Sequence, residues 1–462
     1  MHTDKTFYFK RAWLPNGWAD NVKLEIGSDG TIRKVEKSVS DHPPERFTGT
    51  VIPGMPNIHS HAFQRAMAGL AEHQTSAADS FWTWRETMYR FANRVSPQDL
   101  YHIASQLYVE MLQAGFTSVA EFHYIHHQPD GAPYPAPEEA GLALLRAAAD
   151  VGIGITLLPV LYMRSGFSAR SVNHEQRRFA NSLDSYLYLF DQLRKHCDKH
   201  PLQQLGLALH SLRAVPTQAI SEVLTEIERR APGCPIHIHI AEQILEVEDC
   251  IESLGQRPVE WLLSNHKVDN RWCLIHATHL SQQEIQMLAH SGAVAGLCPT
   301  TEANLGDGIF PLFEYLSEGG SIAVGSDSNI SVSLIEELRW LEYGQRLARR
   351  QRNICVNDQE QHTGTNLYTE CLAGGALALG QPVGRIEAGY RADILVLDEQ
   401  TPLLANTADD SLLDTFIFSG NRNLVRKVMV GGEWKVIDFN HPDAVEITGN
   451  YIDAVKRLKG AG

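Results

Sequence analysis

The sequence lacks any stretch that is apolar and long enough to span a bilayer, and it has no low-complexity tract or internal repeat. These absences argue against membrane-spanning, disordered and solenoid architectures. Basic residues are in short supply, because 40 Lys and Arg stand against 55 Asp and Glu and leave a formal net charge of -15. Such a chain repels nucleic acid and acidic membrane surfaces, so we expect neither as a partner.

Cysteine is sparse and follows no pairing pattern. The seven cysteines are scattered, and no CxxC pair occurs. This distribution favours a reducing compartment and argues against a metal site built from thiolates. The segment from Met1 to Phe7 lacks the charged start and apolar stretch of a secretory signal. We therefore expect a cytoplasmic location.

The middle of the chain alternates between short β-branched apolar runs and stretches whose apolar residues recur every three to four positions. Eight strand–helix units in roughly 300 residues are typical of a closed parallel barrel, so we predict an α/β protein with a (β/α)8 TIM-type barrel. An open doubly wound sheet would need a glycine-rich phosphate loop after an early strand, and the sequence has none. The predicted strands are Ile52–His59, Thr117–Phe122, Gly154–Leu161, Leu205–Leu209, Ile236–Ile240, Trp272–His276, Ala293–Cys298 and Ser321–Gly325.

Helical spacing is clear between these strands. The stretch from Ser281 to His290 opens with a capping-box pattern, because Ser281 is followed three residues later by Glu284. The other helices that we expect are Pro97–Ala114, Glu138–Asp150, Phe179–His200 and Thr217–Arg230.

Both ends of the chain are rich in short alternating strands, with turn signals such as Asn16-Gly17 and Gly431-Gly432 between them. Two β-rich ends around a different middle predict one small β-sandwich domain assembled from both termini. The expected bounds are 1–51 and 385–462 for the two parts of this domain and 52–384 for the barrel. The strands expected in it are Phe7–Leu14, Val22–Ile26, Ile32–Val35, Thr48–Ile52, Ala392–Leu397, Val425–Val430 and Glu433–Val436.

Polar side chains gather where the barrel strands end, which is where barrels of this kind place their active sites. Histidines and carboxylates predominate among them, and one arginine follows strand four. The residues concerned are His59 and His61 on strand one, Glu121, His123 and Tyr124 on strand two, His210 and Arg213 on strand four, His237, His239 and Glu242 on strand five, His276 and His279 on strand six, and Asp327 on strand eight.

The spacing of His59 and His61 indicates a shared metal ion. Side chains alternate along a strand, so residues two apart point the same way, and neutral imidazole suits zinc and similar cations. An imidazole from strand five and a carboxylate from strand eight would complete the protein ligands, leaving one position for water. A lone HxH is more often structural, and Asp327 alone is compatible with a helix N-cap. Their meeting on one barrel mouth favours a metal site.

These residues resemble the amidohydrolase superfamily, whose barrels begin with HxH and end with Asp after strand eight. The likeness extends to the terminal β-domain, where the segment 389–398 is similar to the return segment of that family. The deaminase branch carries HxxE on strand five, here His239 to Glu242. A closer resemblance, to the branch that acts on N-formimino-L-glutamate in histidine degradation, rests on the segments 59–72, 81–86, 120–124 and 210–213.

The resemblance implies a role for each site residue. Glu242 would be the proton shuttle, which carries a proton to the nitrogen that leaves, and His276 would help to position the attacking water. We also expect Asp327, close to that water, to accept its proton. His237 shares a strand face with His239, and we choose His239 because it keeps the HxxE register. The implied metal ligands are His59, His61, His239 and Asp327, and the implied substrate-binding residues are Gln64, Arg85, Tyr124, His210 and Arg213.

One zinc ion is the expected cofactor, although three imidazoles and an aspartate also accept iron or manganese. Members of the superfamily with two metals usually bridge them with a carbamylated lysine from a central strand. The lysines between His61 and Asp327 are Lys195, Lys199 and Lys267, and none lies at a strand end. A homodimer is expected from the resemblance alone.

The expected activity is hydrolytic deimination of the linear amidine N-formimino-L-glutamate, which gives N-formyl-L-glutamate and ammonia. Arg85 and Arg213 suit a dicarboxylate substrate, because guanidinium binds carboxylate through two parallel hydrogen bonds. Two alternatives remain at this point: a deaminase of an aminated heterocycle such as guanine, and a barrel that serves as a non-catalytic scaffold. Ordinary ion pairs would equally explain the two arginines, and Glu86 beside Arg85 keeps that interpretation open.

Overall fold

The structure is a computed structural model that describes residues 4–39, 48–73, 81–167, 171–405, 407 and 409–460. Its centre is a sheet in which every pair of neighbouring strands is parallel. A bridge between Ser60 and Asp327 brings the first strand next to the last and nearly closes the barrel. The strands are β5 (Met55–Ser60), β6 (Phe116–His123), β7 (Gly154–Leu161), β8 (Gln203–Leu205), β9 (Leu207–Leu209), β10 (Ile236–Ile240), β11 (Trp272–His276), β12 (Val294–Leu297) and β13 (Ser321–Val324).

The predicted (β/α)8 barrel is confirmed by this arrangement. The short segments β8 and β9, separated by Gly206, together occupy the place of the fourth predicted strand. Strands β6, β7, β10, β11 and β12 are buried along their whole length. Continuous burial explains why these segments are uninterrupted apolar runs, since helices cover the outside of a parallel sheet.

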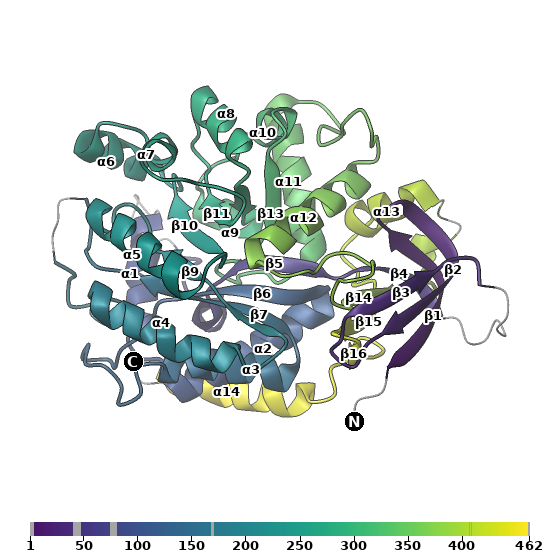
Figure 1. Ribbon diagram of the computed structural model, residues 1–462, viewed down its shortest axis with the longest axis horizontal. Coiled ribbons are helices and arrows are strands. Elements are labelled where there is room, and N and C mark those ends of the chain that lie inside the picture. Colours follow the sequence, from purple (N-terminus) through teal and green to yellow (C-terminus); the bar gives the residue numbers. More distant parts are fainter. Residues whose placement is uncertain are drawn as a thin grey trace.

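Helices alternate with the strands and surround the barrel (Figure 1). The capping box predicted at Ser281 is present, because its side chain accepts from the Glu284 backbone N–H while Glu284 bonds back. The helices are η2 (Ala62–Met67), α1 (Phe81–Ala92), α2 (Pro97–Ala114), α3 (Glu139–Val151), α4 (Leu183–Cys197), α5 (Thr217–Arg230), α6 (Ile244–Leu254), α7 (Pro258–Asn265), α8 (Gln282–Ser291), α9 (Pro299–Leu305), α10 (Leu312–Ser317), α11 (Leu334–Arg349), α12 (Thr363–Leu379), η3 (Pro402–Leu404), η4 (Asp409–Ser411), α13 (Leu412–Phe418) and α14 (Ala444–Gly460).

The strands of both termini form a second, separate sheet beside the barrel (Figure 1). Its order is β16-β15-β14-β4-β1-β2-β3, and β4 pairs in parallel with β1 on one side and antiparallel with β14 on the other. The expected sandwich is thus realised as one continuous mixed sheet. Its strands are β1 (Lys5–Leu14), β2 (Gly17–Ile26), β3 (Ile32–Glu36), β4 (Thr48–Pro53), β14 (Ile394–Leu397), β15 (Val425–Val430) and β16 (Glu433–Val436).

The chain passes from the terminal sheet into the barrel at Gly54, which lies between β4 and β5. A Cβ atom at this position would lie 2.2 Å from the Thr117 side chain, so only glycine allows the close approach. The single predicted strand Ile52–His59 is therefore divided between the two sheets. The domain bounds 51/52 and 384/385 stay predictions.

The C-terminal helix α14 packs along α2 on the outside of the barrel (Figure 1). Arg457 donates to the Asp99 carboxylate over 2.8 Å, and Thr448 donates to Gln106 over 2.9 Å. Among the helices of the described ranges, none has the length and apolar character that crossing a bilayer requires.

Candidate active site

Closure of the barrel places the HxH pair beside Asp327. The backbone N–H of Asp327 donates to the His59 carbonyl over 2.9 Å, and the N–H of His61 donates to the Asp327 carbonyl over 3.0 Å. Gly325 permits this contact, because a Cβ atom there would lie 2.7 Å from the His59 nitrogen. Asp327 has a left-handed backbone with φ +47°, which is costly for a residue other than glycine. The N-cap of the following helix is Ser333, so Asp327 does not serve as that cap.

The four predicted metal ligands converge where the first and last barrel strands meet. The ligand nitrogens of His59, His61 and His239 lie within 4.8 Å of one another. Asp327 Oδ1 lies 3.5 Å from His59 Nε2 and 3.4 Å from His61 Nε2. All four side chains are buried, so residues from β5, β10 and the end of β13 surround one enclosed point.

The donor set fits a divalent cation. His61 Nδ1 lies 2.9 Å from the Phe122 carbonyl and His239 Nδ1 lies 3.1 Å from the His210 carbonyl, so each ring donates there and turns a bare Nε2 inward. Burial lowers the pKa of His59 to about 3 and also lowers the pKa values of His61 and His239, which keeps the rings neutral. His59 Nε2 and His239 Nε2 lie 3.0 Å apart, a spacing at which both nitrogens can bind one cation.

A second group of buried side chains has the pKa values and spacing that suit proton transfer. Burial raises the pKa of Glu242 to about 7, so this carboxyl group exchanges a proton near neutral pH. His276 Nε2 lies 3.7 Å from Glu242 Oε1 and 3.8 Å from Asp327 Oδ2. Burial lowers the pKa of His276, but nearby carboxylates outweigh this effect and raise it. Glu242, His276 and Asp327 therefore form one electrostatically linked group beside the imidazoles.

The predicted substrate-binding residues line the same region. Gln64 Nε2 donates to the Tyr124 hydroxyl over 3.1 Å, and Gln64 Oε1 has no partner. The ring of His210 lies 5.2 Å from the ring of His239. Burial and the charge of Arg213 lower the pKa of His210 well below its ordinary value, so this ring is neutral as well.

The two arginines carry unused donors. Within the described residues neither Arg85 nor Arg213 takes part in an ion pair, although Glu86 is adjacent to Arg85. Arg85 Nε and Arg213 Nη1 are buried and have no hydrogen-bond partner in the described part of the chain. Buried cationic N–H groups without acceptors are costly, which is the condition expected of a site that receives an anion.

Several residues with a supporting role escaped the sequence analysis. Glu302 on α9 accepts from His276 Nδ1 over 3.2 Å and from the Cys298 N–H over 2.9 Å, and it thereby orients the His276 ring. Gln176 donates to the hydroxyls of Tyr89 and Tyr162 over 3.2 and 2.8 Å. Glu302 lies four residues after Cys298, just beyond the end of the seventh barrel strand, β12, and this position is the sequence signal that points to it.

Other candidate groups have separate explanations. His237 lies outside the imidazole cluster, and its Nε2 lies 2.7 Å from the Ala378 carbonyl. Cys298 lies near His276 and Glu302, but burial raises the pKa of its thiol well above the ordinary value and disfavours thiolate ligation. His126 and His127 bond to the carbonyls of Val160 and Ala180.

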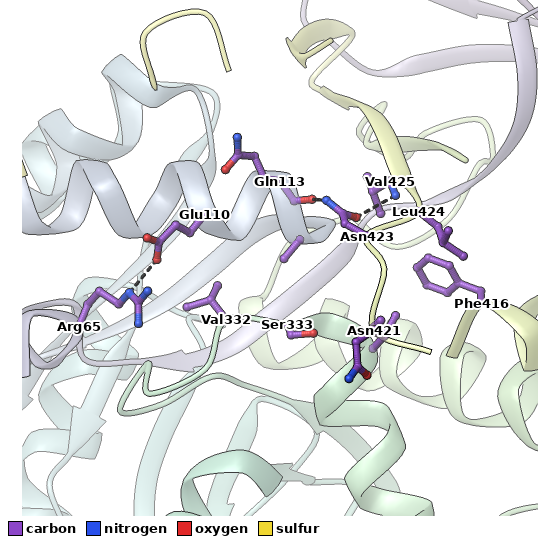
Figure 2. Close-up of a pocket in the computed structure, with 12 residues that line it drawn as sticks. Arg65, Glu110, Gln113, Val332, Ser333, Phe416, Asn421, Asn423, Leu424 and Val425 are labelled. Carbon is purple, nitrogen blue, oxygen red and sulfur yellow. Dashed lines mark hydrogen bonds and ion pairs between the residues drawn. The ribbon is translucent and has the colours of Figure 1, made fainter. Parts of the chain in front are cut away.

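A separate hollow of about 280 Å³ lies between α2, the start of α11 and the segment before β15. Figure 2 shows the ion pair on its wall, in which Arg65 Nε donates to Glu110 over 2.7 Å. Arg65 also donates to the Asn329 carbonyl over 3.0 Å. None of the predicted site residues lines this hollow, so it is distinct from the imidazole cluster.

Comparison with known proteins agrees with this geometry. A model described as "Amidohydrolase family" matches residues 50–435, and one described as "Formimidoylglutamate deiminase HutF, N-terminal domain" matches residues 5–48. The chain therefore belongs to the amidohydrolase family. A protein named formimidoylglutamate deiminase from Pseudomonas aeruginosa is 52% identical to it over 438 residues, which cover 94% of this chain and 95% of the relative.

Two solved structures show the same fold. The crystal structure of an amidohydrolase from Brucella melitensis has a TM-score of 0.93 and 43% identity, and it covers 98% of this chain and 99% of that chain. An adenosine deaminase from Xanthomonas campestris with bound zinc has a TM-score of 0.82 and 19% identity and covers 99% of both chains. At that identity the second likeness concerns the fold alone.

Proposed function

We propose that this chain hydrolyses N-formimino-L-glutamate to N-formyl-L-glutamate and ammonia, as a step of histidine degradation. The observation that carries the proposal is a pair of guanidinium groups that form no ion pair with any described residue and share one barrel mouth with a buried cluster of imidazoles. The 52% identical relative named formimidoylglutamate deiminase supports the same substrate. Retention of all four expected ligands disfavours a non-catalytic scaffold.

We assign His59, His61, His239 and Asp327 as ligands of one divalent cation, with zinc as the preferred ion. A cation held there would make a water molecule more acidic and would thus supply the nucleophile near neutral pH. Lys195 lies on α4, and Lys199 and Lys267 follow helices, so no described lysine between His61 and Asp327 approaches a strand end. This supports a single ion.

The protein groups carry out the proton transfers. Burial raises the pKa of Asp327, but its interactions with His59, His61 and His276 outweigh burial and hold it well below its ordinary value, so the carboxylate is ionised and accepts the proton of water. The water oxygen bonds to the formimino carbon, and a protonated Glu242 gives its proton to the terminal nitrogen. The proton held by Asp327 then passes to the same nitrogen, and the C–N bond breaks as ammonia leaves with the bonding electron pair. The proton of the former water hydroxyl returns to Glu242 as the carbonyl of the product forms. His276 donates to the oxygen that gains charge, an interaction that contributes a few kcal/mol in comparable sites.

The side chains around Glu242, His276 and Asp327 are the ones that we assign to substrate binding. Arg85 Nε and Arg213 Nη1 have no partner among the residues that the structure describes, and a guanidinium group can present two N–H donors in parallel to a carboxylate. Gln64 donates to Tyr124, and the rings of Tyr124 and His210 lie 5.1 and 5.2 Å from those of His61 and His239. We assign to these three residues the orientation of the formimino end. We also propose a cytoplasmic location and a homodimer.

Ammonia release from N-formimino-L-glutamate and from guanine, measured side by side with zinc-loaded protein, tests this function. We expect turnover of the first substrate and none of the second, because two guanidinium groups suit a dianion rather than a neutral purine. Faster release from guanine would overturn the proposal and favour a heterocycle deaminase.

A further inference from the structure

Helix α1 presents an aromatic–cation–aromatic row on one face. Trp82, Arg85 and Tyr89 are spaced by three and four residues, and side chains at these spacings lie on the same side of a helix. The guanidinium carbon of Arg85 lies 4.4 Å from the centre of the Trp82 ring and 5.6 Å from that of Tyr89. Both contacts are within the range of cation–π attraction.

The same indole reaches the second arginine. The guanidinium carbon of Arg213, from the loop between β9 and α5, lies 5.6 Å from the centre of the Trp82 ring. One aromatic side chain therefore contacts two cations that come from different parts of the chain. Within the described residues, Trp82 is the only aromatic ring over which the Arg213 guanidinium lies.

Two cations held close together need an attractive partner. Burial lowers the pKa of Arg85, and the charge of Arg213 lowers it as well. Burial lowers the pKa of Arg213, but the charges of Glu246 and Glu242 outweigh this effect and raise it. Among the described residues neither carboxylate forms an ion pair with Arg213, so neither occupies the N–H groups that the substrate needs. An aromatic face attracts the flat side of a guanidinium and leaves the N–H groups in its plane free. The free Arg85 Nε and Arg213 Nη1 agree with this arrangement.

We propose that Trp82 is a positioning residue that holds Arg85 and Arg213 in place for two substrate carboxylates and so selects dianionic over monoanionic ligands. This inference rests on the proposed function, because it concerns the same dicarboxylate site. It assigns the selectivity to a side chain that makes no ion pair with the substrate. Loss of the indole would leave both arginines in the chain but would no longer fix their separation.

The test uses zinc-loaded protein and two probes, N-formyl-L-glutamate and N-formyl-4-aminobutyrate, which lacks one carboxylate. Trp82→Leu should weaken calorimetric binding of the dicarboxylate about ten-fold, as two lost cation–π contacts imply, and should change binding of the monocarboxylate much less. Trp82→Phe keeps an aromatic face and should restore most of the difference. In steady-state assays, Trp82→Leu should raise KM for N-formimino-L-glutamate while kcat stays within about two-fold.

Trp84 provides a matched control on the same helix, since its ring centre lies 6.1 Å from that of Phe81 and no described arginine lies over its ring. Trp84→Leu should leave the preference for the dicarboxylate unchanged. Equal binding of the dicarboxylate by wild type and Trp82→Leu would overturn the inference, as would a loss of both probes that Trp84→Leu reproduces. Failure of the wild type to release ammonia, with the probe result as expected, would instead reject the proposed function alone.

Discussion

Burial sets the protonation of the side chains at the barrel mouth. The same loss of water keeps His59, His61 and His239 neutral and raises the pKa of Glu242 to about 7. The imidazoles are therefore suited to bind a cation, while Glu242 is suited to exchange protons. Burial at the barrel mouth therefore accounts both for the neutral imidazoles and for the raised pKa of Glu242.

Glu242→Gln separates these two roles. Glutamine has the shape of glutamate but cannot give its proton to the leaving nitrogen, so we expect kcat to fall by about 10²–10⁴-fold. Zinc content should stay at that of the wild type, because Glu242 is not among the assigned ligands. Metal analysis and turnover measured on the same sample check this, and loss of metal would show that Glu242 is a ligand.

Arg213→Lys tests the carboxylate contact. Lysine keeps the charge but not the two parallel donors or the flat face that lies over Trp82, so we expect KM to rise by about ten-fold or more with little change in kcat. Steady-state kinetics with N-formimino-L-glutamate provide the readout. Kinetics identical to those of the wild type would remove Arg213 from the carboxylate site.

Among single residues, the sequence predicts those whose place follows from the periodicity or the end of a strand. His59 and His61 follow from the alternation of a strand, and Asp327 follows from its place after the last strand. Glu302 and Trp82 depend on which helices fold back over the mouth. Trp82 lies in the stretch 81–91, whose aromatic residues at near-helical spacing are compatible with plain core packing, so tertiary contacts alone distinguish its role.

At the scale of elements, the seam between β5 and β13 joins the HxH pair to Asp327. Asn57 on β5 binds Ser326 in both directions, with distances of 2.7 and 3.1 Å, and Asn329 donates to the Asp327 carbonyl over 2.9 Å. The left-handed backbone of Asp327 is therefore held by hydrogen bonds on both sides.

Gly325→Ala should open this seam. Its new Cβ would lie 2.7 Å from the His59 backbone nitrogen, and overpacking of this kind typically costs about 1–3 kcal/mol. We expect a lower unfolding midpoint in urea together with weaker zinc binding. Gly449→Ala is the control, because no atom lies within 4 Å of the added Cβ in α14, and it should stabilise by about 0.5–1 kcal/mol. Unchanged zinc affinity in Gly325→Ala would contradict the seam's role.

Element types follow from periodicity more readily than the partners of each strand. Helices α2 and α5 begin and end where the sequence predicts, and the barrel strands match within a few residues. The division of Ile52–His59 at Gly54 is not visible in local pattern, because the apolar run continues across it. The pairing of β4 with both β1 and β14, which yields one mixed sheet, is likewise a long-range feature.

At the scale of the whole molecule, a chain with a net charge of -15 has to attract a dianion. The bulk field opposes that encounter, so binding depends on local positive charge at the mouth. Arg85 and Arg213 supply it without ion-pair partners among the described residues. The barrel, closed through β5 and β13, holds those charges and the imidazole cluster in one mouth.

Titration of metal-free protein with zinc, followed by ammonia release from N-formimino-L-glutamate, tests the central claim most directly. The ligand set of His59, His61, His239 and Asp327 predicts that activity rises in proportion to added zinc and reaches its plateau at one equivalent per chain. A plateau at two equivalents would contradict the single-ion site. No ammonia at any zinc occupancy would contradict the proposed reaction itself.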